Sequence, residues 1–544
     1  MENSPIVQTQ LLIDNVIAFI SGTPWIDIYN ARLEILKEKA SFPCELAIAG
    51  RVKAGKSSFL NALLGEDLAM VGTTETTATI NFFRYGRPQD PMFPVKVVWD
   101  NGKEEWQSKA FLDSLQGTSK ATLQRAQKID HLEYFVENPI LHNITLVDTP
   151  GTGALVQEHE QRVNNYLSVE EEQLRKKHND QSVAIKDRAD AVIIMTDHVP
   201  TAKTDELVAR FKDNTSAFNS LGVMTKIDTE NETVEGWNKR CEQYSSMLRK
   251  QLNTIIPVSA GVYRAVQKLR QQNRLEQMQR MLRQIPNEGN LFDELVCSST
   301  IFLGDGDEET ELFSAFSLSI DDRKALAEGL PWRVFYVIAK ELYYNDVEEA
   351  CKHLIAYSGM EHLKDMLEKQ FFNRSRIIRC ARIVNEVHSI LEEIKNRRFY
   401  DTRFEVNNRD EYLKLVKESC ASVNIKKALT NFIETNICTK AQYEANEKEV
   451  YSLIKQTEEI QQSFQGTDNQ NEALILLERK QSSFRPNEIK ELEWLFGKYA
   501  DANNAIDVSL YGQRQSFWRA RSHQVADSEI KHIIELAIHA YGTK

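Results

Sequence analysis

The feature that most constrains the fold is the segment 50–57, which reads G-x-x-x-x-G-K-S. It lies between residues 44–49 (CELAIA), which predict a buried strand, and residues 58–64 (SFLNALL), which predict the beginning of a helix. In this order, the N–H groups of the loop and the helix N-terminus surround an anion. The segment therefore predicts a phosphate-binding loop, against the alternative of an ordinary glycine-containing turn.

Two side chains of this loop suit a nucleoside triphosphate. Lys56 would reach the terminal phosphates, and the Ser57 hydroxyl would be a ligand of Mg²⁺, so both are candidate catalytic residues. The expected nucleotide-binding residues of the loop are Gly50, Val52, Lys53, Ala54, Gly55, Lys56, Ser57 and Ser58.

A second motif closes the apolar run 144–147, where Asp148 is followed three residues later by Gly151. Asp148 would hold the Mg²⁺ through water, and the Gly151 N–H would bond the γ-phosphate. A D-x-P-G sequence is often only a turn. Its place at the end of a strand that follows a phosphate loop favours the functional interpretation.

A third motif, Thr225-Lys226-Ile227-Asp228, follows the strand-like run 221–224. The Asp228 carboxylate can accept hydrogen bonds from N1 and N2 of guanine, and adenine offers no such pair, so the wrong base would leave a buried acceptor unpaired. The Lys226 stem would pack on the base. A surface loop is the alternative. About thirty residues on, Val258-Ser259-Ala260 would supply the last loop on the base side, through Ser259 and Ala260.

Residues 72–78 (GTTETTA) separate the first two motifs. One threonine there should complete the Mg²⁺ shell when the γ-phosphate is present. Thr76 is the expected residue and Thr77 the alternative, while a solvated strand entry would give a similar pattern. Four such elements in this order predict a domain that binds GTP or GDP with Mg²⁺.

The set GRVKAGKSS, ETTA, LVDTPG, TKID and VSA resembles the dynamin superfamily of large GTPases, and most closely its bacterial dynamin-like members, among them the type linked to enterotoxin output and membrane vesicles. The resemblance covers residues 44–260 and extends to the helical remainder. It implies an α/β P-loop GTPase domain, with a mixed, mostly parallel sheet and helices on both faces, plus an elongated α-helical bundle as neck or stalk.

The resemblance also implies an activity and partners. GTP hydrolysis would accelerate when two GTPase domains of like chains meet, and stalk movement would act on a membrane, in remodelling or vesicle release. Further dynamin-like subunits are candidate partners. The alternatives are a nucleotide-dependent scaffold or switch that assembles with protein partners without deforming lipid, and a guanine-nucleotide binder with little hydrolysis.

The loop departs from dynamin itself at two positions. Val52 and Lys53 stand where dynamin has glutamine and serine, which position water and help to hold a monovalent cation. Lys53 also stands where the guanylate-binding and atlastin branches carry a cis arginine finger. We hypothesise that its ammonium supplies positive charge near the β–γ bridge, against the alternative of a solvent-exposed lysine.

Composition limits where such a chain works. The net charge of −12 disfavours a nucleic-acid binder. The first ten residues contain no lysine or arginine, and no apolar run approaches the length of a membrane span. The seven cysteines are scattered without metal spacing, as in a reducing compartment. We therefore expect a cytoplasmic protein whose membrane contact, if any, is peripheral.

The breaker residues divide the chain. Its first 373 residues hold 12 prolines and 18 glycines, whereas its last 171 hold one proline and four glycines. So few breakers over such a length predict long helices in the last part. We expect N-terminal helices at 1–41 that join a helical bundle, a GTPase domain at 42–373 with a helical insertion at about 262–355, and a helical stalk at 374–544. The alternatives place the N-terminal helices on the GTPase domain and end that domain near residue 285. A hairpin is predicted at 95–107, turning at Asn101-Gly102.

Heptad spacing supports the stalk. Apolar residues repeat at 377, 384 and 391 and at 380, 387 and 394, and a second stripe runs from 443 to 464. Packing inside a bundle is the favoured interpretation, and a dimer seam is the alternative. Residues 395–403 (KNRRFYDTR) and 506–511 (IDVSLY) are the candidates for a lipid contact at the stalk tip.

Overall fold

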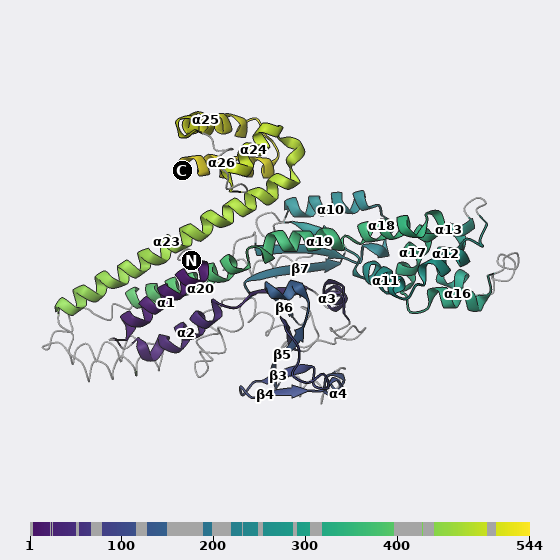
Figure 1. The fold of residues 1–544 in the computed structure, drawn as a ribbon, viewed down its shortest axis with the longest axis horizontal. Coiled ribbons are helices and arrows are strands. Elements are labelled where there is room, and N and C mark those ends of the chain that lie inside the picture. Colours follow the sequence, from purple (N-terminus) through teal and green to yellow (C-terminus); the bar gives the residue numbers. More distant parts are fainter. Residues whose placement is uncertain are drawn as a thin grey trace. The chain divides into compact units, whose positions relative to one another are not determined.

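The computed structural model describes residues 4–50 apart from 22 and 24, then 54–66, 79–115, 128–149, 189–197, 219–247 apart from 231, 254–286, 291–304, 318–396, 427, 440–497 and 507–543 (Figure 1). The chain forms two compact units. The helical unit comprises Met1–Cys44, Glu170–Asp190 and Lys369–Lys544, and the sheet unit comprises Glu45–Val169 and Ala191–Glu368. The domain boundaries expected from the sequence stay a prediction.

The sheet unit is built on a mixed sheet of nine strands within the described residues, in the order β4-β3-β5-β2-β6-β1-β7-β8-β9. Strands β1, β7, β8 and β9 run parallel, whereas β2 is antiparallel to β6. The strands are β1 (Cys44–Gly50), β2 (Ile80–Tyr85), β3 (Val95–Trp99), β4 (Glu104–Gln107), β5 (Ile129–Val136), β6 (Ile144–Asp148), β7 (Ala191–Asp197), β8 (Ser220–Thr225) and β9 (Ile255–Pro257).

The central strands are buried along almost their whole length and are mostly apolar, which is typical of a sheet covered on both faces. The expected α/β class is confirmed. Strands β3 and β4 pair antiparallel across Asn101 and Gly102, and Gly102 has a φ of 78°, so the predicted hairpin is confirmed as well. Short elements beside this end of the sheet are α4 (Lys109–Asp113) and η1 (Pro139–His142).

Helices of the sheet unit follow the strands whose ends carry the motifs. Helix α3 (Lys56–Leu64) follows β1, and the short η3 (Ile227–Thr229) with α10 (Val234–Met247) follows β8. Helix α11 (Ala260–Gln271) begins directly after β9 and packs on α3, where Arg264 Nη1 donates to the Asn61 carbonyl at 2.9 Å.

A helical layer with its own hydrophobic core extends from α11 to residue 358. Phe335, Ile338 and Leu354 are fully buried in that core. Its further helices are α12 (Leu275–Leu282), α13 (Leu291–Val296), α14 (Ser299–Leu303), α16 (Ile320–Ala327), α17 (Trp332–Tyr344) and α18 (Val347–Ser358).

Helix α19 (Met360–Leu367) buries Leu363, Met366 and Leu367, as the apolar spacing predicts. The spacing of Ser358 and Glu361 in the sequence predicts a capping box at the start of this helix, and that prediction is wrong. Ser358 is the last residue of α18, and Gly359, with a φ of 66°, stands at the N-cap without a side-chain hydrogen bond. A π-helical turn, η4 (Glu368–Phe372), follows.

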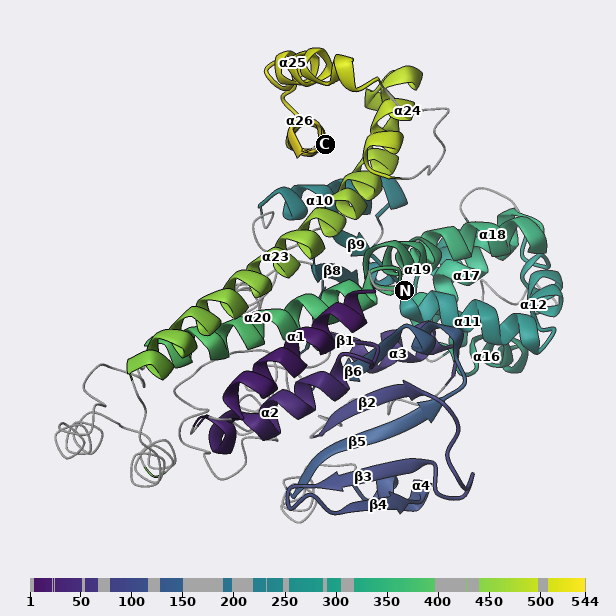
Figure 2. The ribbon, with the colours of Figure 1, turned by 60° about the vertical axis from the view of Figure 1, so that its left-hand side comes forward.

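In the helical unit, α1 (Pro5–Ile20) and α2 (Ile26–Lys39) share one hydrophobic core with α20 (Ser375–Asn396) and α23 (Lys440–Arg479) (Figure 2). Cys380, Val384, Val387 and Leu391 are fully buried there. The first heptad stripe therefore faces helices of the same chain, which confirms internal packing.

A second core in the helical unit joins the end of α23 to the C-terminal helices. Its polar centre is the Glu491 carboxylate, whose Oε1 accepts from Trp518 Nε1 at 2.8 Å and from the Tyr541 hydroxyl at 2.7 Å. No described helix is long and apolar enough to cross a membrane. The remaining elements are η7 (Gln481–Ser483), α24 (Pro486–Leu495), η9 (Val508–Leu510), α25 (Tyr511–Ser522) and α26 (Ser528–Thr543).

Candidate functional site

The phosphate side of the site begins where β1 ends. Gly50 pairs with Met195 of β7 so closely that a Cβ on Gly50 would lie 2.6 Å from the Met195 carbonyl oxygen. Gly55 is the N-cap of α3 with a φ of 83°, a conformation that glycine adopts without strain. Both glycines of the motif are therefore required by backbone geometry, and they present the N-terminus of α3 as an anion site.

Lys56, the first residue of α3, is buried and donates from Nζ to the Gly50 carbonyl at 3.3 Å. Burial lowers the pKa of this ammonium, and the nearby Asp148 carboxylate opposes that shift. Ser57 and Ser58 lie in the first turn of the same helix. Ala54 is buried at the end of the loop.

Asp148 is the last residue of β6 and is fully buried. Neither oxygen of its carboxylate has a hydrogen-bond partner among the described residues. Burial raises the pKa of this carboxyl to about 6, although the Lys56 ammonium opposes the shift. A buried carboxylate is costly to keep ionised, even with the Lys56 ammonium and the Asn81 side chain nearby. Hard oxygen donors beside a buried lysine fit a hydrated divalent cation with an anionic ligand.

The base side of the site is built by η3 and the start of α11. The Ser259 hydroxyl donates to Asp228 Oδ1 at 2.5 Å and accepts from the Val262 N–H at 3.1 Å, so it orients the carboxylate and caps α11. Ala260 is the first residue of α11. Lys226 has a φ of 60°, which is strained for a residue with a Cβ, and such strain is concentrated at functional sites.

One hydroxyl joins the two sides. Thr225 Oγ1 lies 2.8 Å from the Ala54 carbonyl oxygen and 3.2 Å from the Thr196 carbonyl oxygen. The base motif thereby fixes the backbone of the phosphate loop. Sequence reasoning gave Thr225 a place in nucleotide binding but missed this contact, which joins residues 171 positions apart.

The structure brings together part of the expected site. Gly50, Ala54, Gly55, Lys56, Asp148 and Thr225 lie on the phosphate side, and Lys226, Asp228, Ser259 and Ala260 on the base side. Val52, Lys53, Thr76 with its alternative Thr77, and Gly151 lie outside the described residues. The roles of all these residues stay predictions.

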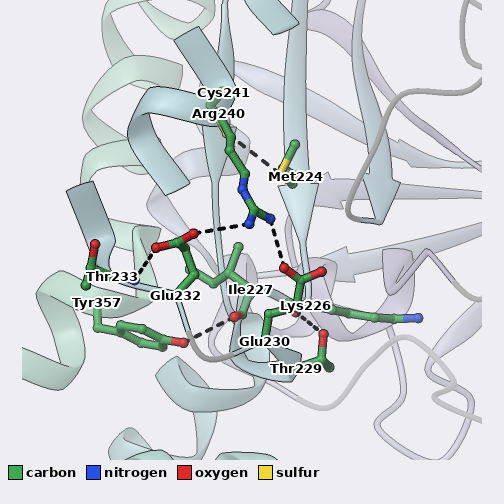
Figure 3. Close-up of polar contacts among 10 residues, drawn as sticks. All are labelled: Met224, Lys226, Ile227, Thr229, Glu230, Glu232, Thr233, Arg240, Cys241 and Tyr357. Atoms are coloured by element: carbon green, nitrogen blue, oxygen red, sulfur yellow. Dashed lines mark hydrogen bonds and ion pairs between the residues drawn. The ribbon is translucent and has the colours of Figure 1, made fainter. Parts of the chain in front are cut away.

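Ion pairs that the sequence did not indicate hold the loop that follows Asp228 (Figure 3). Arg240 of α10 donates to Glu230 at 2.8 Å and to Glu232 at 3.1 Å. Its guanidinium also lies over the Trp237 ring, 4.9 Å from the centroid.

A glycine-containing loop before α3, an aspartate at the end of β6, and a T-K-x-D turn after β8 together define a P-loop domain of the GTPase class. Residues 46–227 match the model of the dynamin family. The match identifies this part of the chain as similar to the dynamin family.

Several proteins are similar to part of the chain. The isoniazid-induced protein IniC of Mycobacterium tuberculosis is 32% identical over 138 residues, which are 25% of this chain and 26% of that protein. Dynamin-like protein 1 of Campylobacter jejuni is 31% identical over 22% of this chain and 16% of its own length. The bacterial dynamin-like protein of Nostoc punctiforme is 31% identical over 20% and 16%. The chain thus spans about a quarter or less of the length of these relatives.

Among solved structures, an oligomerised bacterial dynamin pair described as sensing and tethering membranes aligns with 94% of this chain and 86% of its own. Its sequence identity is 15% and its TM-score is 0.32. At these values the likeness carries no argument about function.

Proposed function

We propose that the protein binds GTP with Mg²⁺ and hydrolyses it. The observation that carries the proposal is the arrangement of one site from two halves: buried Lys56 and Asp148 on the phosphate side, and Asp228 oriented by Ser259 on the base side. Thr225 joins the halves through the Ala54 carbonyl. The match of residues 46–227 to the dynamin family supports a guanine nucleotide as the ligand.

Each side chain then has a separate task. Lys56 binds the terminal phosphates, Ser57 and Thr76 contribute hydroxyl ligands, and Asp148 holds the metal through water. Mg²⁺, when bound, neutralises charge on the phosphate oxygens. Lys53 supplies positive charge at the β–γ bridge. Replacing Lys53 with Ala should lower turnover without weakening nucleotide affinity, and unchanged turnover would refute its role.

Base recognition can be tested by changing one hydrogen-bond acceptor of the Asp228 side chain into a donor. Asp228→Asn replaces a carboxylate oxygen with an NH₂ donor, which suits the C2 carbonyl of xanthine instead of the C2 amino group of guanine. The affinity for GDP should fall at least tenfold and that for XDP should rise. Asp293→Asn, in α13 beside Lys340, is the matched control. Equal effects of both substitutions would contradict the role of Asp228.

We propose further that hydrolysis rises when two GTPase domains meet, and that the stalk then moves to remodel a membrane or release vesicles. Kinship with the dynamin superfamily supports this proposal. Turnover per molecule should increase with protein concentration, whereas a weakly hydrolysing binder would show a constant, low value. The enterotoxin-output type, further dynamin-like subunits and a cytoplasmic, peripheral location stay predictions.

A scaffold or switch that never deforms lipid is the second candidate for the whole chain. Sedimentation with liposomes, with and without GTP, separates the two, because only the membrane-acting protein should sediment with lipid. The candidate lipid contacts at 397–403 and at Ile506 lie outside the described residues, while Val508 is 71% and Leu510 43% exposed.

A further inference from the structure

The last turn of α18 contacts the two base-side loops, which carry Asp228 and Ser259. The Tyr357 hydroxyl donates to the carbonyl oxygen of Ile227, the residue before Asp228, at 3.3 Å (Figure 3). Its neighbour Ser358 accepts from the Ser259 N–H through its carbonyl at 2.9 Å. Two consecutive residues of one helix therefore hold the two loops whose side chains, Asp228 and Ser259, hydrogen bond to each other.

The backbone at Gly359, directly after α18, lies very close to the end of strand β9. Gly359 has a φ of 66°, and a Cβ there would lie 2.1 Å from the carbonyl oxygen of Pro257, the last residue of β9. Only glycine allows the end of α18 to come so close to the loop that begins α11. The approach places Tyr357 and Ser358 within hydrogen-bond distance of the base site.

The helix end is itself rigidly supported. Leu354 and Ala350 on α18 are fully buried in the core of the helical layer. Burial, with the Asp228 carboxylate as a second cause, raises the pKa of the Tyr357 phenol, so the group stays protonated and donates its hydrogen. A donor fixed on a packed helix restricts the turn that carries Asp228.

We propose that Tyr357 is a positioning residue for guanine selectivity, which holds the η3 turn so that the Asp228 carboxylate faces the base. This inference rests on the proposed binding of guanine nucleotides. The geometric reason is pre-organisation: a turn already held in its binding conformation loses less freedom when the base binds. Tyr357 acts on the base only through the Ile227 carbonyl and the Asp228 side chain that follows it.

The test compares two tyrosines with the same chemistry in the full-length protein. Tyr357→Phe removes one hydroxyl that bonds a backbone carbonyl at the base site. Tyr343→Phe removes a hydroxyl of the same helical layer that donates to the Ile285 carbonyl at 3.0 Å. Dissociation constants are measured for GDP and for IDP, which lacks the 2-amino group that Asp228 accepts from, together with the unfolding temperature of each variant.

We expect Tyr357→Phe to weaken GDP binding about two- to tenfold, to weaken IDP binding less, and so to narrow the GDP-to-IDP ratio. Tyr343→Phe should lower the unfolding temperature and leave that ratio unchanged. A Tyr357→Phe protein with the wild-type ratio would overturn the inference, whatever its stability. A wild-type protein that binds neither nucleotide would instead refute the proposed function, and one that binds both equally would refute the recognition of the base by Asp228.

Discussion

The buried carboxyl of Asp148 predicts that an inactivating substitution stabilises the ligand-free protein. Its pKa is raised from 3.8 to about 6, so the folded chain binds this proton more tightly than the unfolded chain does. The contribution of this bound proton to the stability of the fold is complete below pH 3.8 and is lost as the pH rises through about 6. At pH 7.5 the ionised group therefore destabilises the fold by about 3 kcal/mol.

Asp148→Asn removes the ionisation and keeps the shape. At pH 7.5 without ligand we expect the variant to unfold about 5 °C above the wild type, and at pH 4 the gain should disappear. With GTP and Mg²⁺ the order should reverse, because a ligand at one thousand times its dissociation constant stabilises the wild type by about 4.1 kcal/mol, more than the variant gains, and the variant hardly binds it.

The assay is thermal unfolding at both pH values with and without ligand. Asp197→Asn is the matched control, because Asp197 also ends a strand of this sheet but has a side chain 32% exposed and paired with Lys226 at 3.7 Å. At pH 7.5 without ligand it should not gain the stability that Asp148→Asn gains, because its side chain is partly exposed to water. A ligand-free Asp148→Asn protein that is no more stable than the wild type at pH 7.5 would refute the reasoning.

Two other predictions concern packing and charge. Asp190 is fully buried against two buried arginines of α20, so Asp190→Ala should lower the free energy of unfolding in urea by about 3–5 kcal/mol. Glu348→Ala, at a side chain that is 84% exposed beside Lys352, should lower it by less than about 1 kcal/mol. Equal losses would contradict the burial argument. Gly50→Ala forces a Cβ to within 2.6 Å of the Met195 carbonyl oxygen, so both nucleotide binding and the unfolding temperature should fall; a Gly50→Ala protein with wild-type affinity for GDP would show that β1 and β7 can separate freely.

The sequence predicts those parts of the fold whose signals are local. The helix after the G-x-x-x-x-G-K-S segment, the Asn101-Gly102 hairpin and the heptads of α20 each depend on residues a few positions apart, and the structure has these elements where they were expected. Local patterns also mislead: a capping box at 358–361 fits by spacing, but the close approach of Gly359 to Pro257 decides the conformation instead.

Contacts over long separations are invisible in such patterns. Tyr357 reaches Ile227 across 130 positions, and nothing in the spacing of α18 distinguishes this tyrosine from Tyr343 or Tyr344. The Glu491 centre of the C-terminal core has the same property, because its partners stand 27 and 50 positions away. Tertiary packing creates these sites, so the sequence alone could not identify them.

In the proposed function, the shared hydroxyl of Thr225 couples the binding of the base to the binding of the phosphates thermodynamically. It joins the T-K-x-D turn to the Ala54 carbonyl of the phosphate loop, so ordering either segment lowers the entropy that the other must still lose. By reciprocity, guanosine should tighten the binding of pyrophosphate by the same factor by which pyrophosphate tightens the binding of guanosine. The affinity for a whole nucleotide then exceeds the value expected from the affinities of its two fragments measured separately. A nucleotide with the wrong base is also held less firmly at its phosphates.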